Sequence, residues 1–334
     1  MSKKSLSIWI VTDNKPGHLN QLKGLCERLA AHHNTIEKWI SIEESNSNWL
    51  DCLLGRYDTT SDRALQGPDI IIGAGHSTHK EILTIKRAFN CFAVVLMKPS
   101  IPRASFNAAI IPEHDKPTLR DNTLITKGVL NTISPRSESP LEHQSNQGVI
   151  LIGGESKHYH WDSPKVAEQV IQVINNQPNT LWTLSNSRRT PPDFMIKLNE
   201  LLALSPLSKL NIIPHTETPP GWVKQQMQQS SQIWVTPDSV SMVYEAITSG
   251  AATGLFEMLP SKQGRIVKGI KRLIDEEWVT EFSIDKLKQA LPSSATQLWE
   301  ADRAALWLLD QFDAYKKQLK VDKNSSLTKN SKEE

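Results

Sequence analysis

The stretch Ser231–Glu257, which reads SQIWVTPDSVSMVYEAITSGAATGLFE, constrains the fold of this chain more than any other. It contains a short apolar run typical of a strand, then a polar turn from Asp238 to Ser241, a helical stretch and a second apolar run. The polar turn therefore follows a strand and begins a helix. In open α/β sheets ligands bind at that position, where free backbone N–H groups and the helix dipole attract phosphates and sugar oxygens.

The same alternation of strands and helices extends along most of the chain. Apolar runs predict strands at Leu6–Thr12, Asp69–Gly73, Cys91–Met97, Asn107–Ile111, Val149–Gly153, Leu181–Leu184, Leu210–Pro214, Ile233–Thr236 and Ala252–Phe256. Helices are predicted after many of them, at His18–His32, Thr78–Phe89, Pro164–Asn175, Asp193–Leu204 and Val240–Ser249. Continuous apolar runs are typical of parallel strands that are covered on both faces. The sequence therefore predicts an α/β fold with doubly wound parallel sheets.

The segment Thr132–Gln147 lacks periodicity and is rich in Ser, Pro and charge, which favours a linker. A strand, a Gly-containing loop and a helix follow one another both at the start of the chain and after this linker. We therefore expect two Rossmann-like domains, 1–146 and 147–293, whose sheets face one another. A terminal helix is predicted at 294–320, core-facing rather than a membrane anchor because its polar face mixes acidic and basic residues. The polar tail 321–334 is predicted to be disordered.

Composition narrows the classes of function. A chain of 334 residues fits two domains, and a net charge of +2 gives no reason to expect nucleic-acid binding. No apolar run approaches the ~20 residues that cross a bilayer. The 3 cysteines are widely spaced and odd in number, which favours a reducing cytoplasm over a disulfide framework.

Most reactive side chains fall in loops that directly follow the predicted strands. The first half carries TDNKPGH, GAGHSTH, KPSIPR and PEHD in such loops, and the second half carries GGESKHY, NSRRT and DSVS. Because the carboxyl ends of parallel strands meet at one edge of a sheet, these side chains should converge there. Two facing sheets would then line a cleft with them.

Several of these residues have a structural interpretation beside the functional one. Gly73 and Gly75 would equally serve a tight turn between strand and helix. Asp238 would cap its helix or contact a ligand, and we weigh the two roles equally. Arg188 and Arg189 would form surface ion pairs, yet beside three hydroxyl-bearing residues they also suit a phosphate or carboxylate.

Other chemistries lack the motifs that they require. His76, His79, His158 and His160 have no cysteine or supporting pattern for a closed zinc site, so we expect no metal. The sequence contains no P-loop, no dinucleotide fingerprint and no G-x-S-x-G elbow. ATP hydrolysis, NAD chemistry and a serine hydrolase are therefore disfavoured.

A series of longer blocks resembles the elongated-mitochondria (mitochondrial fission ELM-type) family. The blocks are TDNKPGHLNQ, GAGHSTH, MKPSIPRASFNAAIIPEHD, KGVLN, IGGESKHYHWD, NSRRTPPDF and VTPDSVSMVYEA, in order from Thr12 to Ala246. The family is similar to the GT-B class of glycosyltransferases, which implies two Rossmann-like domains, a cleft between them and a C-terminal helix that crosses back to the N-terminal domain. Two departures from the pattern are Asn14, where we expect glycine, and Tyr244, where we expect a small residue. Asn tolerates positive φ, so the turn at Asn14 should form.

The resemblance implies that a nucleotide-activated sugar binds to the second domain. The glycines of the first loop would let backbone N–H groups approach phosphate oxygens, the arginines would neutralise the departing phosphate, and Glu245 would bind ribose hydroxyls. The expected donor-binding residues are Gly153, Gly154, Ser156, Lys157, Ser187, Arg188, Arg189, Asp238, Ser239, Ser241 and Glu245. Fixed dipoles and guanidinium groups would replace a metal, so no cofactor is expected beyond the nucleotide-sugar substrate.

The acceptor would face the first domain, where a general base must take the proton of the attacking hydroxyl. Asp13 and His18 are the candidates, and His18 is slightly preferred because imidazole exchanges protons near neutral pH. His18 would equally cap or orient its loop. The expected acceptor-binding residues are Lys15, Gly75, His76, Lys98, Arg103, Glu113 and His114.

Three functions remain open on these grounds. The first is a metal-independent glycosyltransferase that acts on a glycan or lipid-linked acceptor, in the cytoplasm or peripherally at the inner face of the membrane. The second is a nucleotide-sugar epimerase of the same fold, which needs no acceptor. The third is a non-enzymatic recruitment adaptor, as the plant members of the family imply.

Overall fold

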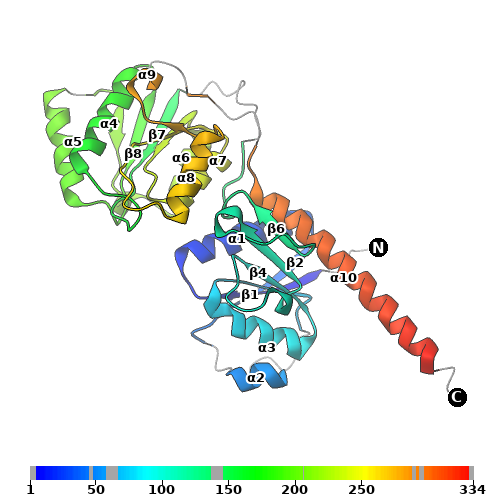
Figure 1. Cartoon of the computed structure of the whole chain (residues 1–334). Helices are drawn as coiled ribbons and strands as arrows, with labels where there is room; N and C mark the ends of the chain where they lie inside the picture. Colours follow the sequence, from blue (N-terminus) through cyan, green and yellow to red (C-terminus); the bar gives the residue numbers. More distant parts are fainter. Residues whose placement is uncertain are drawn as a thin grey trace. The chain divides into compact units, whose positions relative to one another are not determined.

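The protein folds into two units, each built around its own sheet (Figure 1). The structure, a computed structural model, describes residues 5–44, 48–57, 67–136, 146–205, 207–287, 291–292, 297–322 and the backbone of 323–330. Unit 1 comprises Met1–Thr132 and Glu300–Glu334, and unit 2 comprises Ile133–Trp299. The division falls at the start of the predicted linker, of which 137–145 lie outside the described residues. In the described part of the chain, no helix is long and apolar enough to cross a membrane.

Unit 1 contains a parallel sheet of six strands in the order β2-β1-β3-β4-β5-β6. The strands are β1 (Leu6–Thr12), β2 (Thr35–Ser41), β3 (Ile70–Ala74), β4 (Phe92–Leu96), β5 (Ala108–Pro112) and β6 (Thr123–Thr126). The helices are α1 (Pro16–His32), α2 (Trp49–Leu54), α3 (His79–Phe89) and α10 (Glu300–Asn330), with the 3-10 turns η1 (His76–Thr78), η2 (Arg103–Ser105) and η3 (Glu113–Asp115).

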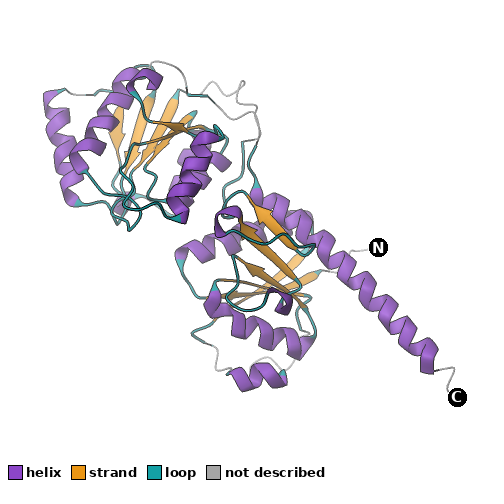
Figure 2. Ribbon diagram, viewed as in Figure 1, coloured by secondary structure: helices purple, strands orange, loops and turns teal. Residues whose placement is uncertain are grey.

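Both faces of this sheet are buried, as continuous apolar strands require. Side chains alternate between the faces, so Ile8 and Ile10 of β1 pack in the cluster that contains α1 and α10. Trp9 and Val11 pack in the opposite cluster, with residues of α2 and α3. Figure 2 shows helices on both sides of the strands in each unit.

Helix α10 packs on α1, β5 and β6, which confirms the predicted return of the C-terminal helix to the N-terminal domain. Asp302 accepts hydrogen bonds from Arg28 and His32 of α1, at 2.8 and 2.6 Å. The predicted start at Ser294 lies outside the described residues, and residues 297–299 are not helical, so α10 begins at Glu300. The Glu300 carboxylate accepts the Lys127 N–H at 2.8 Å and ties the first turn to the segment after β6.

The helix also continues past Val321, to Asn330, where the sequence analysis placed a disordered tail. The prediction rested on the lack of apolar residues to bury. The stretch after Val321 contains neither Gly nor Pro. Gln318 donates to Asp322 one turn further at 3.1 Å, a local bond that supports helix at the start of this stretch. Residues 331–334 of the predicted tail lie outside the described residues.

Unit 2 contains a second parallel sheet of six strands, in the order β12-β11-β10-β7-β8-β9. The strands are β7 (Gln147–Leu151), β8 (Leu181–Ser185), β9 (Leu210–Ile212), β10 (Gln232–Val235), β11 (Ala252–Leu255) and β12 (Thr280–Glu281). The helices are α4 (Ser163–Asn176), α5 (Pro192–Leu204), α6 (Trp222–Gln229), α7 (Val240–Thr248), α8 (Arg265–Asp275) and α9 (Ile284–Leu287), with the 3-10 turn η4 (His215–Glu217).

The strand order reverses once in each sheet. In unit 1 the chain passes from β1 to β2 on one side and returns to place β3 on the other side of β1. In unit 2 it passes outward through β8 and β9 and then returns to place β10 beside β7. Loops that leave adjacent strands at such a reversal diverge and leave room for a ligand. The loops after β1 and β3, and those after β7 and β10, therefore form the candidate sites.

The predicted α/β fold class is confirmed, whereas three strands escaped prediction. These are β2, β6 and β12. Strand β2 pairs only with β1 and forms an edge of the sheet, so it carries the exposed Glu37 and the half-buried Lys38 rather than a continuous apolar run. Edge strands of this kind do not produce the apolar signal on which the strand predictions depended.

Two glycines of α1 provide a test of this packing. A Cβ at Gly24 would overlap with the backbone carbonyl of Asn131, whereas a Cβ at Gly17 meets nothing within 4 Å. We expect Gly24→Ala to lower the free energy of unfolding of unit 1 by about 1–3 kcal/mol, because the backbone of Asn131 must move. Gly17→Ala is the matched control and should be neutral or slightly stabilising. Thermal unfolding followed by circular dichroism compares the two, and equal midpoints would contradict the packing described.

Candidate functional site

In unit 1 the loops after β1 and β3 meet at a buried carboxylate. The Asp13 side chain is only 3% exposed and accepts hydrogen bonds from three side chains. Oδ2 accepts from Lys15 Nζ at 2.7 Å and from Ser77 Oγ at 2.9 Å, while Oδ1 lies 2.8 Å from His18 Nδ1. Ser77 follows β3, so its bond to Asp13 links the loop after β3 to the loop after β1, at the point where the strand order of this sheet reverses.

These bonds keep Asp13 ionised. Burial alone would raise the pKa of this carboxyl, but the hydrogen bonds from Lys15, His18 and Ser77 outweigh burial and hold the pKa well below its usual range. A carboxylate of such low basicity is a poor proton acceptor. Of the two predicted bases, Asp13 is therefore suited to orient its neighbour rather than to take a proton itself.

The orientation of His18 follows from that contact. When the ring is neutral and Nδ1 donates its proton to the ionised Oδ1, Nε2 is the acceptor nitrogen. The ring lies against Gly75, which has φ of +85°, and a Cβ at that position would overlap with the imidazole. Gly75 is thus required both by its backbone conformation and by the closeness of the ring.

The turn that carries this arrangement forms as expected. Asn14 has φ of +57°, the left-handed conformation that Asn tolerates, so the departure from glycine does not disrupt the loop. Its amide N–H donates to Thr12 Oγ1 at 3.0 Å and its side chain donates to Ser41 Oγ at 3.0 Å.

The other predicted acceptor residues divide into two groups. His76 in η1 is exposed beside Gly75, and Lys98, Glu113 and His114 follow the next strands, β4 and β5, at the same edge. Arg103 does not join them, which corrects the prediction. Its guanidinium donates to the carbonyls of Phe106 and Asn122, which precede β5 and β6, so it lies at the opposite edge of the sheet.

Ser77 was not selected from the sequence as a site residue. Its position directly after a strand that neighbours β1 is the signal that would have identified it. That adjacency depends on the strand order, which the sequence does not reveal.

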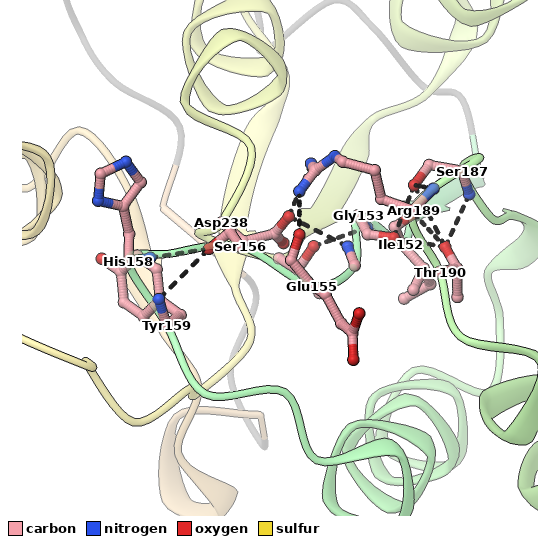
Figure 3. A network of polar contacts seen from close by, with 12 residues as sticks. Ile152, Gly153, Glu155, Ser156, His158, Tyr159, Ser187, Arg189, Thr190 and Asp238 are labelled. Atoms are coloured by element: carbon pink, nitrogen blue, oxygen red, sulfur yellow. Dashed lines mark hydrogen bonds and ion pairs between the residues drawn. The ribbon is translucent and has the colours of Figure 1, made fainter.

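In unit 2 a second buried carboxylate, that of Asp238, joins the loops after three strands (Figure 3). Its side chain is 0% exposed. Oδ2 accepts the Gly154 N–H at 3.0 Å and lies 2.8 Å from an Arg189 guanidinium nitrogen. Burial raises the pKa of Asp238, while Thr236, Arg189 and the Gly154 N–H oppose that rise.

Asp238 therefore does not cap the helix that follows it, which corrects one of its two predicted roles. Ser239 occupies the N-cap position of α7, and among the described residues its side chain makes no capping hydrogen bond. The carboxylate instead points across the loops toward β7 and β8 (Figure 3).

The two glycines after β7 also have a different role from the one expected. The Gly153 N–H donates to Thr236 Oγ1 at 2.8 Å and the Gly154 N–H donates to Asp238, so neither amide is available to a phosphate. A Cβ at Gly153 would overlap with the Asp238 carboxylate, and one at Gly154 would overlap with the Arg189 carbonyl. Both glycines allow neighbouring loops to approach closely.

Of the two arginines after β8, one is held by neighbouring loops and the other is exposed. Arg189 is held by Asp238 and by the carbonyl of Glu155 at 2.9 Å, so it serves the structure of the loops. Ser187 belongs to the same turn, with its hydroxyl donating to the Gly153 carbonyl at 2.7 Å. Arg188 is exposed, and in the described part of the chain no ion pair or hydrogen bond holds its guanidinium.

The start of α7 retains groups that suit an anion. The first N–H groups of a helix have no partner within the helix, and in the described part of the chain the Ser239 side chain does not cap them. The hydroxyls of Ser239 and Ser241 lie at the same helix start and would add donors for an anion. Glu245 is half-buried in the second turn of the helix. Tyr244 stands where a small residue was expected. Its side chain is 3% exposed and packs inward, so it does not lie on the exposed face of α7.

Ser156 and Lys157 follow the glycines. The Ser156 hydroxyl oxygen accepts the N–H groups of His158 and Tyr159 at 3.2 and 3.3 Å and so shapes this loop (Figure 3). Lys157 is exposed. Among the described residues, no three His, Cys, Asp or Glu side chains gather as metal ligands would.

Solved structures of nucleotide-sugar enzymes share this fold. The UDP-GlcNAc 2-epimerase of Methanocaldococcus jannaschii superposes with a TM-score of 0.56 at 10% identity, over 91% of this chain and 99% of that one. The UDP-GlcNAc 2-epimerase of Neisseria meningitidis, solved bound to UDP-GlcNAc, superposes with a TM-score of 0.52 at 13% identity, over 91% and 100% of the two chains. The fold is thus of the GT-B class that such enzymes adopt.

Sequence comparison identifies relatives over most of the chain. An uncharacterised protein of Rickettsia prowazekii is 25% identical in an alignment of 302 residues that covers 75% of this chain and 83% of that protein. The profile described as mitochondrial fission ELM1 matches residues 16–312, which include the site of unit 2 and, in unit 1, His18 and Ser77 but not Asp13. The chain therefore belongs to the mitochondrial fission ELM1 family.

Proposed function

We propose that the protein is a metal-independent glycosyltransferase that moves a sugar from a nucleotide-activated donor to an acceptor hydroxyl. The observation that carries this proposal is the Asp13–His18 pair at the strand reversal of unit 1, in a fold shared with enzymes of nucleotide sugars. A buried carboxylate that orients an imidazole is the arrangement that general-base chemistry requires.

In the proposed step, His18 Nε2 takes the proton of the acceptor hydroxyl as the oxygen attacks the anomeric carbon. The new C–O bond forms while the bond between that carbon and the phosphate oxygen breaks, and the nucleoside diphosphate leaves with the bonding electrons. Asp13 stabilises the imidazolium that results, because its charge lies 2.8 Å from Nδ1. The proton then passes to solvent. Lys15, Gly75 and His76 surround this base, and Lys98, Glu113 and His114 extend the acceptor side along the sheet edge.

On the donor side, the phosphates would bind at the start of α7. Open N–H groups, the hydroxyls of Ser239 and Ser241 and the guanidinium of Arg188 offer positive charge and donors there without a metal. Glu245 would accept ribose hydroxyls from the second turn. The two structural neighbours act on UDP-GlcNAc by name, which supports a UDP-sugar as the first donor to test. We propose a glycan or a lipid-linked molecule as the acceptor, reached from the cytoplasmic side of a membrane.

A nucleotide-sugar epimerase is the second candidate, because both neighbours described above are epimerases. Incubation with UDP-GlcNAc alone, followed by NMR of the sugar protons, separates the two. An epimerase converts the sugar with no acceptor present. A transferase leaves the sugar configuration unchanged and releases UDP slowly by hydrolysis.

The role of His18 is tested by substitution. We expect His18→Ala to lower kcat for sugar transfer by about 10²–10⁴-fold, because a positioned general base contributes that much. The half-buried His33, the C-cap residue of α1, provides the control His33→Ala, which should leave kcat unchanged. The rate of UDP release with acceptor present is the measurement. Equal rates for the two variants and the wild type would rule out His18 as the base, whereas the absence of UDP release from all three would favour the adaptor function.

The two adjacent arginines are expected to respond in opposite ways. Arg188→Ala should weaken UDP binding by about 10- to 100-fold and leave the melting temperature unchanged, because a charge-assisted contact to phosphate is worth about 1.5–3 kcal/mol. Arg189→Ala should lower the free energy of unfolding by about 1–3 kcal/mol, because it leaves the buried Asp238 carboxylate short of a partner. Calorimetric titration with UDP and thermal unfolding of both variants check this. The reverse pattern would place the phosphate at Arg189 instead.

A further inference from the structure

The two oxygens of the Asp13 carboxylate are held by different sets of partners. Oδ1 lies 2.8 Å from His18 Nδ1 and also accepts the backbone N–H of Lys15 at 3.3 Å. Oδ2 accepts from Lys15 Nζ at 2.7 Å and from Ser77 Oγ at 2.9 Å. Because the carboxylate is buried and bonded through both oxygens, it cannot rotate without losing hydrogen bonds that water does not replace.

Ser77 supplies its bond from a turn that is fixed independently of Asp13. It belongs to η1, which follows Gly75. Thr78 fastens this turn, because its backbone N–H and its hydroxyl both donate to the Gly75 carbonyl, at 3.3 and 2.8 Å. The Ser77 hydroxyl therefore reaches Asp13 from a set position on another loop, 64 residues further along the chain.

Lys15 supplies its bond from the loop that carries Asp13 itself. The lysine side chain is 58% exposed, whereas the carboxylate that it meets is 3% exposed. Burial raises the pKa of Asp13, and among the hydrogen bonds that lower it the one from Lys15 has the largest effect. The ammonium group is thus engaged by the protein, as the guanidinium of Arg189 is in unit 2.

The direction of Oδ1 decides which nitrogen of His18 carries the proton. A neutral imidazole can donate from either ring nitrogen, and a hydrogen bond at one nitrogen selects the tautomer. Here Nδ1 faces Oδ1, and the ring lies in the space that a side chain at Gly75 would fill. A carboxylate turned away from Nδ1 would no longer select that tautomer.

We propose that Ser77 and Lys15 are positioning residues for the base: by occupying Oδ2 of Asp13, they keep Oδ1 directed at His18, so that the neutral ring leaves Nε2 free. This inference rests on the proposed function, in which His18 takes the proton of the acceptor. It gives Ser77 a role in the reaction, and it assigns Lys15 to the base instead of the acceptor. Both residues act through Asp13 and touch none of the reacting atoms.

The first test reads the tautomer of His18 by ¹⁵N NMR of the full-length protein labelled at histidine, at an alkaline pH where imidazole is neutral. The His18 signals are those that His18→Ala removes. We expect the wild type to carry the proton on Nδ1, and Ser77→Ala and Lys15→Met to show a mixture of tautomers, because each loses a bond that holds Oδ2. Ser77→Thr keeps the hydroxyl and should keep the wild-type tautomer.

Two matched control variants remove the same kinds of side chain from unit 1. Ser105 lies in η2, a 3-10 turn like that of Ser77, and Lys23 is an exposed lysine of α1. Within the described ranges, neither side chain makes a hydrogen bond or an ion pair. Ser105→Ala and Lys23→Met should therefore leave the tautomer and kcat unchanged, and melting temperatures show that all the variants are folded.

The second test separates kcat from the KM for the acceptor in the transfer reaction. We expect Ser77→Ala and Lys15→Met to lower kcat by about 10- to 100-fold, because a catalytic group displaced by about 1 Å costs up to about 10²-fold in rate. The KM for the acceptor should stay unchanged, since neither residue contacts it. A raised KM with an unchanged kcat in Lys15→Met would instead assign that lysine to the acceptor.

The NMR outcome is independent of any activity. A wild-type ring with its proton on Nε2, or an undisturbed Nδ1–H tautomer in both Ser77→Ala and Lys15→Met, would overturn the inference. A mixture of tautomers in the control variants would overturn it as well. If the tautomer responds as described but His18→Ala transfers sugar at the wild-type rate, the proposed base fails, while the positioning of the ring by Ser77 and Lys15 stands.

Discussion

A buried carboxylate at the strand reversal organises the candidate site of each unit. Asp13 joins the loops after β1 and β3, and Asp238 joins those after β7, β8 and β10. Parallel strands end at one edge but do not by themselves fix the loops that follow, because such loops lack a ladder of backbone bonds. A carboxylate with several donors supplies that order, and its burial makes each of its bonds stronger than the same bond in water.

This constraint determines which polar groups remain for a ligand. In unit 2, the amides of Gly153 and Gly154 and the guanidinium of Arg189 are all used to hold Asp238 and its neighbours in place. The buried network does not use the first turn of α7 or the exposed Arg188 among the described residues. The donors that the proposed function assigns to the substrate are therefore those that this network leaves unused.

The sequence predicted the architecture well because its signals are local. Continuous apolar runs identified nine of the strands to within a few residues, and Asn14 adopts the positive φ that its side chain permits. The site was predicted less well. Arg103, Arg189 and the two glycines were selected by residue type and by position after a strand, but their partners come from strands distant in sequence. Residue type shows that a group can bind phosphate, whereas only the fold shows whether another part of the protein already holds it.

The internal order of the unit 1 site bears on the choice between an enzyme and an adaptor. A recruitment surface needs exposed residues, and their internal order matters little. The site of unit 1 is instead ordered from within: Gly75 takes a φ of +85°, the His18 ring occupies the space that any side chain there would fill, and three donors converge on Asp13. Such arrangements reduce conformational freedom at a cost in free energy, and they yield one imidazole with a defined free nitrogen. Proton transfer depends on a ring nitrogen held in a defined position, whereas recognition of a partner at the protein surface does not.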